Sequence, residues 1–184
     1  MARSTLRRIR IAVWAAIAAV VVVGGWATRL GTRWPSVYYM TGPSMEPTLA
    51  AQEYFFTWSP PGTLQRGHLV IFRYVDEDGE FHVLRRLAGL PGDTVEMQAG
   101  QMLVNGERQP WPFLVLNPSA WRSTFAIGGN LFTWGPWVVP PDSVLLLSDT
   151  RDMVGWPDSR FVGFVPREAI LARATRTVTG RRLH

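Results

Sequence analysis

Short runs of apolar and aromatic residues, each of strand length, recur along most of this chain. Turn-forming residues separate them, as in residues 76–79 (Asp-Glu-Asp-Gly) and in Asn105-Gly106. The pattern predicts strands over Val37–Met40, Tyr54–Trp58, Leu69–Tyr74, Phe81–Leu87, Thr94–Met97, Met102–Val104, Val144–Leu147, Phe161–Phe164 and Ile170–Thr175. Because no long amphipathic helix interrupts them, we expect an all-β, barrel-like domain over residues 36–180.

One segment breaks this rhythm. Residues 107–136 are rich in tryptophan, proline and glycine. We interpret them as an inserted subdomain or lid, and a plain long loop is the alternative.

A continuous apolar run over residues 11–27 precedes the strand pattern. Its length is near the lower limit for a membrane-spanning helix, and Trp26 is placed like an interfacial anchor. A cleaved signal peptide is the alternative, with Gly25 and Ala27 as small residues near a cleavage site. We predict a transmembrane anchor that follows a basic cytoplasmic tail (1–10) and precedes a linker (28–35), with the β-rich domain on the far side of the cell membrane.

Composition narrows the possible chemistry. The chain has 184 residues and a net charge of +5, but four of its arginines crowd the first ten residues, so the charge does not indicate a nucleic-acid surface. There is no cysteine, and only three scattered histidines, which disfavours a disulfide framework or a metal site. We therefore expect no metal or other cofactor. All 19 basic residues are arginine, and the chain has no lysine.

Ser44 is the candidate nucleophile. It follows Gly42 and Pro43, which favour a sharp, open backbone, and it precedes Pro47. Such a turn allows the serine hydroxyl and its own N–H to face one cleft. A serine nucleophile with a backbone oxyanion donor needs this arrangement.

Four more segments accompany residues 44–49 (SMEPTL). They are residues 66–72 (RGHLVIF), 83–93 (VLRRLAGLPGD), 147–152 (LSDTRD) and 158–166 (DSRFVGFVP). Together and in this order they closely resemble the bacterial type I signal peptidases, membrane-anchored serine proteases that remove signal peptides. The resemblance covers the anchor and nearly all of the domain after it.

The resemblance implies a serine–lysine dyad, in which a neutral lysine in an apolar pocket takes the proton of the attacking serine. Family position makes Ser44 the nucleophile and places Arg85 where the lysine is expected. A guanidinium has a pKa above ~12 and only donates hydrogen bonds, so Arg85 is not expected to act as a base. Arg85 can donate to Ser44 or pair with an acid such as Asp149.

Further roles follow from the same resemblance. The shallow apolar pockets for substrate are expected to be lined by Met40, Thr41, Gly42, Met45, Leu49, Val83 and Leu84. Structural support is expected from Arg86, Asp149, Arg151, Asp158 and Arg160, with the last two forming an ion pair. Backbone groups of Val83 and Leu84 are expected to hold an extended peptide by β-addition.

A histidine base is an alternative, because related peptidases of the endoplasmic reticulum and archaea resemble this design but use histidine. His82 lies three residues before Arg85, so on a regular strand it points to the opposite face, and only a β-bulge brings it round. His68 lies at a strand entrance. We expect both to be solvated.

Two functions remain open. The first is a signal peptidase that cleaves signal peptides from exported preproteins after small residues. The second is a catalytically weak or inactive pseudopeptidase that binds signal-peptide-like segments or assists a partner peptidase. Between them lies slow turnover with water or hydroxide accepting the proton, and a pilin- or conjugation-specific peptidase differs only in substrate. Expected partners are preprotein signal peptides and membrane lipid, without nucleic acid.

Overall fold

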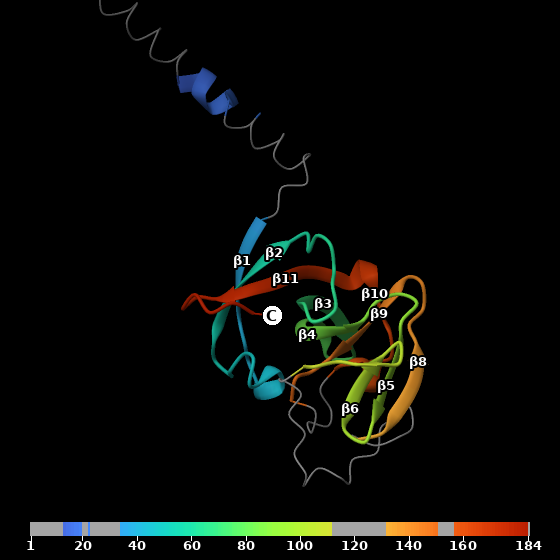
Figure 1. Ribbon diagram of the computed structural model, residues 1–184. Coiled ribbons are helices and arrows are strands. Elements are labelled where there is room, and N and C mark those ends of the chain that lie inside the picture. The colour runs from blue at the N-terminus through green and yellow to red at the C-terminus, as the bar shows by residue number, and fades with distance from the viewer. Residues whose placement is uncertain (1–12, 20–21, 23–33, 112–131, 151–156, 184) are drawn as a thin grey trace, which may run out of the picture. The chain divides into compact units, whose positions relative to one another are not determined.

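The computed structural model describes residues 13–19, 22, 34–111, 132–150 and 157–183 (Figure 1). The chain divides into two compact units, Met1–Trp34 and Pro35–His184. In the first unit, residues 13–19 and 22 are helical. Within the described ranges, no helix combines the length and the apolar character needed to cross a bilayer. The expected basic tail lies outside the described residues, as do parts of the expected anchor and linker.

The larger unit is built on a seven-stranded sheet with the order β1-β2-β11-β3-β4-β9-β10. Its strands are β1 (Trp34–Tyr39), β2 (Tyr54–Ser59), β3 (Leu69–Asp76), β4 (Gly79–Gly89), β9 (Ser143–Leu147), β10 (Val165–Pro166) and β11 (Ile170–Thr177). The registers from β2 through β11, β3, β4 and β9 to β10 are all antiparallel. The expectation of a mostly β domain is confirmed, whereas its barrel-like closure stays a prediction.

A second sheet has the order β7-β6-β5-β8. Its strands are β5 (Thr94–Gln98), β6 (Gln101–Val104), β7 (Glu107–Arg108) and β8 (Trp134–Val138). The sequence pattern missed β8, which begins inside the segment interpreted as an insertion and ends beyond it. Residues 112–131 lie outside the described residues, so the lid also stays a prediction.

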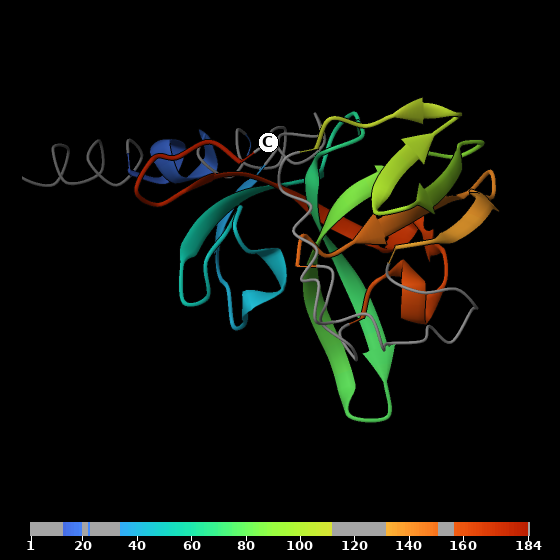
Figure 2. The same cartoon turned by 60° about the horizontal axis from the view of Figure 1, so that its bottom comes forward.

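Two hairpin turns form where the sequence places turn residues. Asn105 and Gly106 both have positive φ, 55° and 79°, as a type I′ turn between β6 and β7 requires. The β3–β4 hairpin pairs Asp76 with Gly79, and the Asp78 N–H donates to the Asp76 carboxylate at 2.9 Å. Figure 2 shows this green hairpin extending beyond its neighbouring strands.

The strand expected over Phe161–Phe164 is wrong. A short helix, α2 (Ser159–Val162), occupies the first half of that stretch. The Asp158 carboxylate caps it by accepting from the Arg160 N–H at 3.0 Å, and Gly163, with φ of 77°, ends it. A four-residue apolar run fits a strand or a buried helical turn equally well, and here the cap and the glycine decide for the helix.

The core explains why β3 is a continuous apolar run. Leu69 and Ile71 pack into one buried cluster, while the alternating Val70 and Phe72 pack into another. A strand buried on both faces needs apolar residues at every position. The C-terminal half of β4 is buried as well, and it carries two charged residues, Arg85 and Arg86. Buried charges need partners, so these two arginines are candidates for a functional role.

Candidate active site

Ser44 lies in η1 (Pro43–Met45), a single 3-10 turn that follows β1, and it is fully buried. Pro43 fits the first position of the turn because its φ is already fixed. Thr150 holds the turn from outside: its hydroxyl donates to the Pro43 carbonyl at 2.7 Å, and its N–H donates to the Ser44 carbonyl at 3.1 Å. Gly42 is extended (φ −146°), a conformation that any residue adopts.

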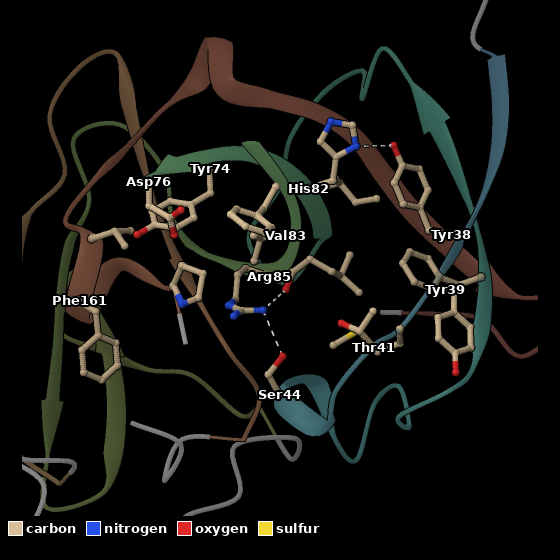
Figure 3. Close-up of a pocket in the computed structure, with 17 residues that line it drawn as sticks. Tyr38, Tyr39, Thr41, Ser44, Tyr74, Asp76, His82, Val83, Arg85 and Phe161 are labelled. Atoms are coloured by element: carbon tan, nitrogen blue, oxygen red, sulfur yellow. Dashed lines mark hydrogen bonds between the residues drawn. The ribbon is translucent and has the colours of Figure 1, made fainter. Parts of the chain in front are cut away.

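Arg85 faces Ser44 from strand β4 (Figure 3). Its Nη1 donates to the Ser44 Oγ at 3.2 Å and to the Leu84 carbonyl at 2.5 Å. The side chain is 1% exposed, and its Nε and Nη2 have no hydrogen-bond partner in the described part of the chain. Of the two contacts expected for Arg85, the structure shows the one to Ser44.

Asp149 pairs instead with Arg86, the next residue along β4. Arg86 Nε and Nη2 donate to the two Asp149 oxygens at 2.7 and 2.6 Å, and both side chains are fully buried. Arg86 also donates to the Gly67 carbonyl at 2.6 Å and to the Thr48 hydroxyl at 2.9 Å. This network joins β4 to the segments that follow η1 and β9 and to the turn that precedes β3.

The expected Asp158–Arg160 ion pair is present. Arg160 Nη2 donates to Asp158 Oδ2 at 2.7 Å, and the Ser148 hydroxyl donates to the same oxygen at 2.5 Å. Burial opposes the charged carboxylate, but the Arg160 charge and these hydrogen bonds lower the pKa of Asp158 to about 2. Asp158 therefore stays ionised and belongs to Arg160. The remaining supporting residue, Arg151, lies outside the described residues.

Three buried arginines thus lie near two buried aspartates, and each aspartate is already bound bidentately or nearly so by another arginine. Among these three described arginines, Arg85 is the one whose guanidinium is not paired with a carboxylate of the described ranges. Burial lowers its pKa to about 10, while Asp158 and Asp149 favour its charged form and Arg160 opposes it. Arg85 is still a cation at neutral pH.

A cleft of about 450 Å³ opens between Ser44, Arg85 and the outer parts of β1 and β4. Of the expected substrate-binding residues, Met40, Thr41, Val83 and Leu84 line it. Met45 and Leu49 are instead fully buried in the core, and Gly42 is buried and outside the lining.

Aromatic side chains in the cleft were not foreseen from the sequence. Tyr38, Tyr39, Tyr74, Phe81 and Phe161 contribute to its lining. The first two directly precede the Ser44 segment, so their place on β1 was a usable signal. Tyr74 and Phe161 come from distant segments and carry no local signal.

The hydrogen bonds of His68 and His82 go to residues other than Ser44, although His82 lines the same cleft. His82 Nδ1 is 3.2 Å from the Tyr38 hydroxyl, and Figure 3 shows this pair well away from Arg85 and Ser44. The pairing of β3 with β4 runs without a register shift, from the pair Leu69 and Arg86 to the pair Asp76 and Gly79. No β-bulge in this stretch therefore turns His82 toward Arg85.

His68 is half-buried and lies outside the cleft lining. Its Nδ1 accepts from the Gln65 N–H at 3.1 Å. Burial, and then the charge of Arg173, lower the pKa of His68 to about 4. Within the described ranges, no three acidic or histidine side chains gather as a metal site would require.

Comparison with known proteins assigns the chain to a family. The model of the family described as signal peptidase, peptidase S26, matches residues 9–179. The chain belongs to this family. Relatives include a probable signal peptidase I-2 of Synechocystis sp., 33% identical over 143 residues that make up 74% of this chain and 59% of the relative. The signal peptidase I P of Bacillus subtilis subsp. natto is 35% identical over 118 residues, which cover 62% of this chain and 61% of the relative.

The chain thus spans about three fifths of the length of these curated relatives. Among solved structures, a signal peptidase I from Enterococcus faecalis matches with a TM-score of 0.44 and 24% identity, covering 60% of this chain and 95% of the other.

Proposed function

We propose that this member of the signal peptidase family binds signal-peptide segments of exported preproteins in the Ser44 cleft and cleaves them slowly after small residues. Ser44 is the nucleophile in this proposal. Arg85 makes the reaction slow, because it occupies the place of the base without being able to accept a proton. Family membership supports the substrate class. The hydrogen bond between Arg85 and Ser44 and the cleft beside them support binding with slow cleavage.

The observation that carries the proposal is the hydrogen bond from Arg85 Nη1 to Ser44 Oγ. The guanidinium donates, so the serine oxygen accepts and its own proton has no base to go to on Arg85. Attack on a peptide carbonyl then needs water or hydroxide to take the proton. Losing a positioned general base typically costs roughly 10²–10⁴-fold in rate.

The edge of β4 supports peptide binding. Strand β9 pairs with β4 only from Arg86 onward, so on that side the described strands leave residues 79–85 without a partner. An extended peptide can add there as a further strand, with side chains in the Ser44 cleft. By resemblance to the family, we expect small side chains at the first and third positions before the cut.

An efficient peptidase is the second candidate. The intact turn around Ser44, held by Thr150, and the two ion pairs behind it favour this function. It requires a base other than Arg85, and His82 is the residue to test.

A cleavage assay on a preprotein with the full-length protein in detergent separates these candidates. We expect little or no cleavage by the wild type at about pH 7 to 9 and none by Ser44→Ala. Arg85→Lys should raise the rate at least about tenfold, which is ~1.4 kcal/mol in the barrier, because a desolvated lysine can be neutral and accept the serine proton.

His82→Ala tests the alternative that a histidine is the base. Efficient wild-type cleavage that is lost in both Ser44→Ala and His82→Ala would show that histidine is the base and that the proposal of slow turnover is wrong.

A further inference from the structure

The charge of Arg85 lacks a counterion in the described part of the protein. Asp149 is bound by Arg86 and Asp158 by Arg160, and both pairs are fully buried. A buried cation without a partner is costly, and an anion that enters the site recovers part of that cost. The Ser44 end of the cleft therefore favours a negatively charged group.

The donors of Arg85 have the right chemistry for one class of anion. Nη1 is engaged by Ser44 and the Leu84 carbonyl, whereas Nε and Nη2 are buried without partners. These two nitrogens form one edge of the planar guanidinium. Such an edge matches the two oxygens of a carboxylate in a bidentate pair.

We propose that the Ser44 cleft is a binding site for the C-terminal carboxylate of a peptide that ends in a small residue. The carboxylate pairs with Arg85, and the residues before it extend along the free edge of β4. This inference rests on the proposed peptide groove and names the chemical end of the chain that the groove prefers.

The shape of the site favours a peptide end over a small free anion. Apolar and aromatic side chains line much of the cleft, including Met40, Phe55 and Ile71, and Asp76 of the β3–β4 hairpin is the acidic residue of the lining. A free inorganic anion gains nothing from that surface, whereas a peptide buries side chains against it. A chain that continues past Ser44 presents a neutral amide at the same point and leaves Arg85 uncompensated.

The ligand class also fixes a place in a reaction sequence. A peptide carboxylate at this position is the product of hydrolysis of a peptide bond after a small residue. A peptidase reaction, by another molecule or by slow turnover here, must therefore supply the ligand.

Isothermal titration calorimetry of the full-length protein in detergent tests the inference. The probes are two synthetic peptides of identical sequence with alanines at the last and third-last positions, one with a free carboxylate and one amidated. We expect at least about tenfold tighter binding of the carboxylate form.

Variants assign the effect to Arg85. Arg85→Met should abolish the preference, and Arg85→Lys should reduce it, since lysine keeps the charge but not the planar edge. Arg108→Met, which removes an exposed arginine of β7, should leave it unchanged. Circular dichroism of each variant checks that it is folded.

Equal affinity of the two peptides for the wild type, or a preference that survives Arg85→Met, would overturn the carboxylate site while leaving the groove in place. Binding of neither peptide would overturn the groove as well. Loss of cleavage in the preprotein assay alone bears only on the proposed slow hydrolysis.

Discussion

At the scale of single residues, Arg85 combines two effects that work against each other. In the proposed function it blocks general-base chemistry at Ser44, to which it donates a hydrogen bond, and it keeps a full charge inside a buried site. Replacing a buried ion pair by apolar side chains of similar volume is often neutral or stabilising, whereas removing one partner of a buried pair is strongly destabilising. Two neighbouring arginines on β4 allow both cases to be compared.

Arg85→Met should raise the free energy of unfolding, because it removes a buried charge that has no carboxylate partner among the described residues. Arg86→Met should lower it by roughly 3–5 kcal/mol, because Asp149 is then left buried and unpaired. Urea unfolding of the full chain in detergent, followed by tryptophan fluorescence, measures both. A loss of stability in Arg85→Met as large as in Arg86→Met would show that Arg85 has an internal counterion.

His68 should make the stability depend on pH in mildly acid solution. Its pKa is lowered to about 4 in the folded protein from an ordinary value of 6.5. Between these pH values the unfolded chain binds a proton that the folded protein does not. As far as His68 is concerned, the free energy of unfolding is therefore highest above about pH 6.5 and falls as the pH drops toward 4.

NMR titration of the imidazole signals checks the pKa directly. His68→Asn, which keeps a side-chain acceptor for the Gln65 N–H, should show a weaker loss of stability between pH 6.5 and 4. A His68 that titrates near 6.5 would contradict the prediction.

At the scale of elements, the short helix α2 shows how local groups decide between two folds of one apolar run. Asp158 caps the helix and pairs with Arg160, and Ser159 Oγ accepts from the Leu146 N–H at 2.9 Å. These bonds attach the helix to β9. They also place Phe161 and Val162 at the cleft.

Gly163→Ala should lower the free energy of unfolding by about 1–3 kcal/mol, because the glycine has φ of 77° and ψ of −162°. A Cβ at this position meets no atom within 4 Å, so the loss reports backbone strain alone. Urea unfolding measures it. A change of only a few tenths of a kcal/mol would mean that the chain leaves α2 in another conformation.

At the scale of the whole molecule, the larger unit combines a seven-stranded and a four-stranded sheet, and the cleft belongs to the former. Expectations for the N-terminal region still rest on its sequence. The apolar run over residues 11–27, after four arginines, predicts an anchor with its N-terminus in the cytoplasm.

The protein should therefore remain full length in membranes, and protease added outside spheroplasts should digest the β-rich domain. Immunoblots with an N-terminal and a C-terminal tag measure both, and a cytoplasmic protein serves as the control for intact cells. Protection of the domain, or a mature form that begins near Thr28, would contradict the predicted topology.

The sequence by itself determined most strands, the two hairpin turns at residues 76–79 and 105–106, and the absence of any lysine. Strand runs and turns such as Asn105-Gly106 depend on neighbouring residues, so local pattern predicts them. The absence of lysine is visible without any structure. The pattern failed where a local signal was ambiguous, at α2, or where strand residues lay among irregular sequence, at β8.

Only the tertiary structure decided which charges belong together. Arg86 and Asp149 are 63 residues apart, and no local pattern indicates that this aspartate pairs with Arg86 and not with Arg85. Likewise, Met45 and Leu49 follow Ser44 in sequence but pack into the core, while Tyr74 and Phe161 reach the cleft from distant segments. Packing and pairing depend on which strands become neighbours. In this sheet β11, from the C-terminal end of the chain, lies between β2 and β3, and a strand buried on both faces fits that position.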